Sequence, residues 1–98
     1  MKPSTETLQE YFTTLGPDEV LARARQFFAT RTPLYAAYPD KQGAGWASFR
    51  GQGGEETVVA ATAVDGGSRV TGSSYMFTSQ LRRFLTTLPA LERRTEVA

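Results

Sequence analysis

The absence of cysteine is the feature that most limits how this chain can fold. Neither a disulfide nor a thiolate-bound metal can stabilise any of its 98 residues. A domain of this length buries only somewhat more than about 60% of the surface that its unfolded chain exposes, so its core is thin. We therefore expect a single domain over residues 1–98 that is held by apolar packing and gains stability from a second copy or another protein.

Histidine is absent as well. The chain therefore lacks the side chain most often used as a general acid or base near neutral pH, a partner for a serine nucleophile, and a common ligand of zinc, copper and haem. We expect a protein that is not an enzyme and that uses no cofactor and no metal.

Charge and hydropathy exclude two further classes of partner. The net charge of +1 argues against nucleic acid. No apolar run approaches the roughly 20 residues of a membrane span, and the polar start is unlike a signal peptide. A cytoplasmic location follows as the expectation.

Two helices are predicted at the N-terminus. Leu8, Tyr11, Phe12 and Leu15 share one helical face. This spacing predicts an amphipathic helix over residues 4–15, within a segment 1–16 that is a possible docking arm. A second helix is predicted from Pro17, which suits a first helical position, to about Thr30–Thr32, just before Pro33.

Beyond Pro33 the hydrophobic period changes toward two. The predicted strands are Leu34–Tyr38, Trp46–Arg50, Glu56–Val64 and Ser68–Met76. Their short connections favour an antiparallel meander. A helix over Thr78–Leu88 and a frayed tail over residues 90–98 complete the chain. The expected fold class is α+β, a four-stranded antiparallel meander flanked by two N-terminal helices and one C-terminal helix (α-α-β-β-β-β-α).

The third predicted strand suggests a second apolar face on the sheet. Its side chains are apolar on both faces of the sheet, with Val58 and Ala60 on one side and Val59 and Ala61 on the other. A strand wetted on one side alternates more cleanly. Either this second face meets a partner or ligand, or the N-terminal helix covers it, or its small alanines tolerate exposure.

The order of elements resembles a known family. The segment Gly16–Ala24, the strand meander, and Arg69–Gly72 leading into Gln80–Leu85 are similar to a shortened helix-grip domain, the superfamily of START, polyketide-cyclase and Bet v 1-like proteins. The resemblance covers roughly residues 17–88 and rests on element order and hydrophobic pattern. It implies a curved antiparallel sheet around a long C-terminal helix and an apolar cavity. The chain is shorter than the family, and no catalytic or ligand position is transferred.

Catalytic and metal-binding interpretations have weak support. An acid/base cluster would bring Tyr38, Asp40 and Arg50 together at one end of a strand pair, but Asp40 lies in a segment rich in Pro and Gly, where Asp is common in turns. Glu55 and Glu56 supply too few oxygens for calcium.

These patterns favour a non-catalytic binding or accessory module. We expect it to self-associate, as a homodimer, or to dock onto a larger assembly through an aromatic sheet face. Trp and Tyr are strong interface anchors. The candidate interface residues are Tyr35, Tyr38, Trp46, Phe49 and Tyr75. A candidate basic patch that could meet an acidic protein partner comprises Arg23, Arg25, Arg82 and Arg83. The alternative is a carrier of a small apolar ligand held between the sheet and the C-terminal helix, which requires a cavity.

Overall fold

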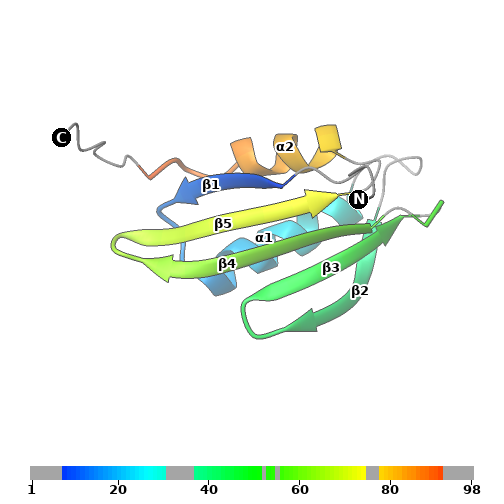
Figure 1. The fold of residues 1–98 in the computed structure, drawn as a ribbon, viewed down its shortest axis with the longest axis horizontal. Helices are drawn as coiled ribbons and strands as arrows, with labels where there is room; N and C mark the ends of the chain where they lie inside the picture. Colours follow the sequence, from blue (N-terminus) through cyan, green and yellow to red (C-terminus); the bar gives the residue numbers. More distant parts are fainter. Residues whose placement is uncertain (1–7, 31–36, 52, 55, 75–77, 92–98) are drawn as a thin grey trace, which may run out of the picture.

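The computed structural model describes residues 8–30, 37–51, 53–54, 56–74 and 78–91. Over these residues it forms a five-stranded antiparallel sheet and two helices in the order β-α-β-β-β-β-α (Figure 1). The elements are β1 (Gln9–Thr13), α1 (Pro17–Ala29), β2 (Ala37–Gly43), β3 (Trp46–Gly51), β4 (Glu56–Val64), β5 (Gly67–Ser74) and α2 (Thr78–Thr86). The order across the sheet is β1-β5-β4-β3-β2, so the first strand lies beside the last. The predicted α+β class and the antiparallel meander, which is β2 to β5, are confirmed, whereas the sheet has five strands and not the predicted four.

The predicted N-terminal helix is wrong. Residues 9–13 form an edge strand, whose Tyr11 pairs with Val70 of β5. Three side chains of this strand point inward, and two of them are polar: Gln9 Nε2 donates to the carbonyl of Thr78 at 3.2 Å, and Thr13 Oγ1 donates to that of Pro89 at 2.6 Å. The third, Tyr11, packs against the core and donates from its hydroxyl to the carbonyl of Leu88 at 3.0 Å. With polar residues at two of the three inward positions, the apolar residues of this segment matched a helical spacing instead of an alternating one. No amphipathic docking helix exists over residues 9–13.

Helix α1 begins where its sequence predicts. Pro17 occupies the first turn together with Asp18 and Glu19, whose negative charges suit the positive end of the helix dipole. Its buried stripe comprises Val20, Leu21, Ala24 and Phe28. This stripe packs against β2, β3, β4 and β5.

Strand β2 spans different residues from those predicted. It begins at Ala37 and continues to Gly43, through residues that lie beyond the predicted strand Leu34–Tyr38 in the segment rich in Pro and Gly. A register shift between Pro39 and Lys41 accommodates the proline in this edge strand. The hairpins that follow turn at Gly45 (φ 79°) and Gly66 (φ 86°), a left-handed conformation that glycine adopts without strain.

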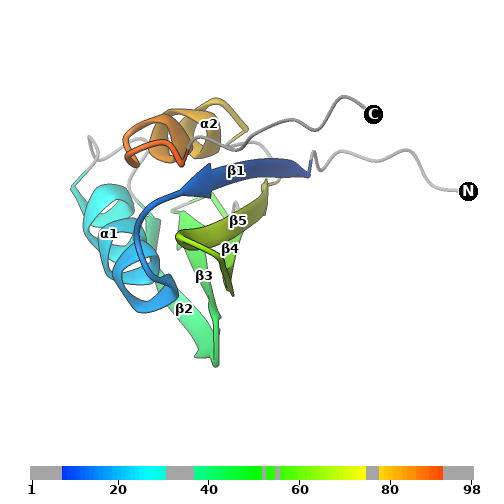
Figure 2. The ribbon, with the colours of Figure 1, turned by 90° about the vertical axis from the view of Figure 1, so that its left-hand side faces the viewer.

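Both helices lie on the same side of the sheet (Figure 2). We call the side that they cover the inner face. Inner residues meet across the strands: Ala47 pairs with Val59, and Ala61 pairs with Val70. Gly72 of β5 lets α2 approach closely, because a Cβ there would lie 2.8 Å from Leu81 Cδ1.

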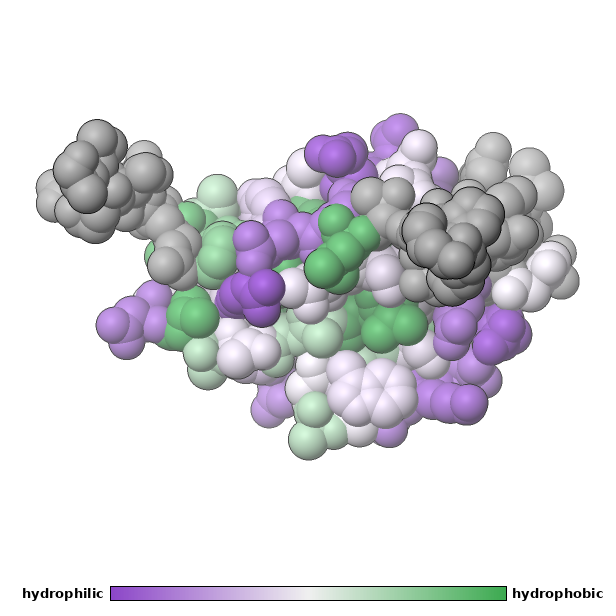
Figure 3. All heavy atoms as spheres, in the orientation of Figure 1, coloured by the Kyte–Doolittle hydropathy of each residue, from purple (hydrophilic) through white to green (hydrophobic). Residues whose placement is uncertain are grey.

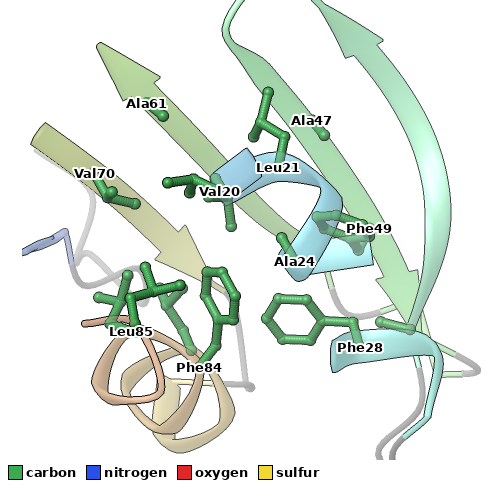
Figure 4. Close-up of a cluster of buried hydrophobic side chains, with 14 residues drawn as sticks. Val20, Leu21, Ala24, Phe28, Ala47, Phe49, Ala61, Val70, Phe84 and Leu85 are labelled. Atoms are coloured by element: carbon green, nitrogen blue, oxygen red, sulfur yellow. The ribbon is translucent and has the colours of Figure 1, made fainter. Parts of the chain in front are cut away.

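Three buried phenylalanines, Phe28, Phe49 and Phe84, form the centre of the core (Figure 4), and the partly buried Phe27 packs against it. The ring centroid of Phe28 lies 5.1 Å from that of Phe49, 5.2 Å from that of Phe27 and 5.6 Å from that of Phe84. These distances are typical of favourable aromatic pairs. The cluster thus joins α1 and α2 to each other and to β3.

Phe49→Ala should lower the free energy of unfolding by about 3–5 kcal/mol, because it removes a fully buried ring and leaves a cavity. Urea unfolding followed by circular dichroism measures this loss. Thr62→Ala, an exposed change on β4, is the matched control and should alter stability by less than about 0.5 kcal/mol. Equal effects of the two variants would contradict the assignment of Phe49 to the core.

Candidate docking surface

The side of the sheet opposite the helices is the outer face, and the strand register defines it. One row runs across all five strands through Gly43, Trp46, Ala60, Thr71 and Glu10. Flanking rows place Lys41, Ser48, Val58 and Ser73 on one side and Thr62, Arg69 and Phe12 on the other. In Figure 1, α1 lies behind the strands and α2 lies along the β1 side of the sheet, so neither described helix covers this face (Figures 1 and 2).

Apolar side chains occupy the middle of the outer face. Val58, Ala60 and Phe12 are half-buried, and Trp46 keeps 37% of its surface exposed. Leu8, immediately before β1, is 72% exposed. Figure 3 shows this side of the molecule, where several hydrophobic (green) side chains lie across the middle with pale and hydrophilic (purple) ones between and around them. An exposed apolar patch with a polar margin is typical of an interaction site.

The indole of Trp46 is held against the neighbouring strand. A Cβ added to Gly43 would lie 2.3 Å from Trp46 Nε1, so the ring occupies the space that a side chain on β2 would need. Beside it on β4 stands Ala60, which is small. Trp46 is therefore a large, exposed and positioned aromatic side chain, of the kind that anchors protein interfaces.

Paired charges surround the apolar middle. At the β1–β5 side, Arg69 donates from Nε to Glu10. Toward β2, Arg50 Nη2 lies 3.2 Å from Asp40 Oδ2 and 3.7 Å from Glu56 Oε2. These side chains are partly exposed, so each pair adds little to folding stability. These ion pairs hold the charged side chains at defined positions around the apolar middle of the outer face.

The predicted interface residues have different fates. Trp46 lies on the outer face, whereas Phe49 is fully buried in the core and is not available to a partner there. Side chains alternate along β3, so Trp46 and Phe49 lie on opposite faces of the sheet. Phe49 is the inward one, because its ring packs against Phe28 of α1. Tyr35, Tyr75 and the side chain of Tyr38 lie outside the described residues. The sequence reasoning missed Phe12, because residues 9–13 were predicted as a helix.

The four arginines of the candidate basic patch line three of the hollows on the described part of the surface. Arg82 and Arg83 line a hollow along α2 with Thr78, Ser79 and Thr86. Arg23 lines a second hollow with Phe27 and Thr87, and it also pairs with Glu19 at 3.8 Å. Arg25 lines a third hollow, with Asp18 and the β2–β3 hairpin.

Two residues of the weaker catalytic interpretation can be located in the structure. Asp40 and Arg50 do meet, as an ion pair in which the side chains remain 29% and 47% exposed. No group of carboxylates in the described part of the chain could hold a metal ion. Among these same residues, no helix has the length and apolar character needed to cross a membrane.

Comparisons with protein-family models, with curated proteins and with solved structures give no match to this chain.

Gly43→Ala should displace the indole of Trp46, because the added methyl group overlaps it. Since the chain has a single tryptophan, its fluorescence reports this directly. We expect stronger acrylamide quenching, with a circular dichroism spectrum like that of wild type. Gly16→Ala, where a Cβ meets nothing within 4 Å, is the control. Unchanged quenching in Gly43→Ala would contradict the described position of the ring.

Proposed function

We propose that the protein is a non-catalytic binding or accessory module that docks through the outer face of its sheet. The observation that carries this proposal is the combination of an exposed, positioned Trp46 with half-buried apolar neighbours on a face opposite both helices. Its occupant is either a second copy or a component of a larger protein assembly.

The packing of the inner face favours this proposal over a ligand carrier. A carrier of the helix-grip type needs an apolar cavity between sheet and C-terminal helix. In that position Phe84 is fully buried, Leu85 is 3% exposed, and the Phe27 and Phe84 ring centroids lie 5.5 Å apart. Among the described residues, these side chains themselves occupy the region beside the C-terminal helix where a carrier would hold its ligand.

The resemblance to helix-grip domains is part of the proposal as a relation of fold. The antiparallel sheet packs against both helices, and α2 contacts β5. A small relative whose cavity is filled by its own side chains would retain the scaffold without the carrier function. Its remaining apolar surface would then be the outer face.

A photoreactive amino acid at Thr62 tests the docking surface in the native cell. Thr62 is exposed on the outer face, whereas Ala22, which is exposed on α1, provides the matched position on the helical side. We expect a discrete cross-linked species from position 62 and none from position 22. Equal cross-linking at both positions, or none at position 62, would contradict the proposal.

Trp46→Ala should weaken docking at least about tenfold, as expected for a central aromatic anchor. The readout is the yield of the position-62 cross-link. The circular dichroism spectrum should stay close to that of wild type, because the ring lies outside the core. Global unfolding of this variant would instead place Trp46 among the residues that hold the monomer together.

A further inference from the structure

We infer that the outer face binds the same face of a second copy, in a two-fold symmetric dimer. This inference rests on the proposed function and names its partner. It follows from three features of the described residues: the balance of charge on the face, the condition of the sheet edges and the area available.

The charges on and beside the outer face are balanced. Three carboxylates (Glu10, Asp40 and Glu56) stand with three basic side chains (Lys41, Arg50 and Arg69). A strongly acidic or basic partner finds no complement on such a surface. A second copy does, because in a two-fold interface paired charges of one protomer can exchange partners with those of the other.

The edges of the sheet are poorly suited to pairing with a second copy, so we expect the copy to bind the outer face. At β1, the carbonyl of Phe12 accepts from Leu91 N at 2.9 Å, and Thr14 N donates to the carbonyl of Pro89 at 3.2 Å. The other edge, β2, contains Pro39 and a register shift, and it carries the charged Lys41. Proline, bulges and lysine are the common means by which proteins prevent edge pairing.

The area of the outer face matches a small dimer interface. Five strands spaced about 4.8 Å apart, with a length of about seven residues, give a face of roughly 500 Å² in projection. Two copies would bury on the order of 1,000 Å² in total, the size of a weak or transient specific interface, so we expect a dimer that dissociates on dilution. The chain's own residues 1–7 are a poorer occupant, because apart from Met1 and Pro3 they are charged or carry a hydroxyl group.

The test reverses the charge of Glu10 in one variant and of Arg69 in another, and then mixes the two variants. Glu10→Arg alone makes the face positive, and Arg69→Glu alone makes it negative, so each variant repels itself. Light scattering after size exclusion should give twice 10.7 kDa for wild type and at least about tenfold weaker dimerisation for each single variant. An equimolar mixture of the two should form heterodimers, seen by native mass spectrometry, because their faces are then complementary.

Two controls separate a dimer defect from a folding defect. The double variant Glu10→Arg/Arg69→Glu restores charge balance and should dimerise like wild type, and Ala22→Glu on α1 should have no effect. Thermal melts should show every variant folded, since an exposed ion pair contributes only about 0–1 kcal/mol.

The inference is overturned if wild type is a monomer up to about millimolar concentration, or if the single variants dimerise as well as wild type. A monomer that still gives a discrete position-62 cross-link to a different protein would retain the proposed docking function with another partner. A monomer without that cross-link would remove both.

Discussion

The contact of Phe28 with three other phenylalanine rings determines where everything else lies. Phe28 comes from the last turn of α1, Phe49 from β3 and Phe84 from α2, and each is fully buried. Because these rings meet at one point, both helices must cover the same side of the sheet. A chain of 98 residues has enough apolar side chains for one such core. The outer face is the consequence, since the described residues provide no second helical layer.

Small residues on the inner face make this arrangement possible. Ala24, Ala47 and Ala61 are nearly or fully buried, and Gly72 lies beneath Leu81. Larger side chains there would push the helices away from the sheet and open the aromatic cluster. The same small size is repeated on the outer face at Gly43 and Ala60, and there nothing in the described chain fills the space except the indole of Trp46. Small residues thus serve helix packing on one face and the presentation of an aromatic ring on the other.

Much of this fold follows from local sequence signals. Pro17 with two acidic residues predicts the start of α1, and the pattern over Glu56–Val64 predicts β4 with its bounds. Strand β1 could not be predicted in this way, because its inward Gln9 and Thr13 are polar. Their hydrogen bonds go to carbonyls at the two ends of the α2 region, more than 60 residues away in the chain. A pattern confined to neighbouring residues contains no information about such partners.

The candidate surface, like the fold, could be predicted only in part from neighbouring residues in the sequence. Alternation along β3 places Trp46 and Phe49 on opposite faces, and this can be read from the sequence. Which face is covered depends on where Phe28 and Phe84 arrive, and this is fixed by packing between distant elements. Trp46 is the aromatic residue of β3 that remains on the outer face. Its neighbours Gly43 and Ala60 are small, and the charges around it are balanced. An apolar centre, paired charges and blocked edges together direct association to the outer face, where a second copy provides the matching surface.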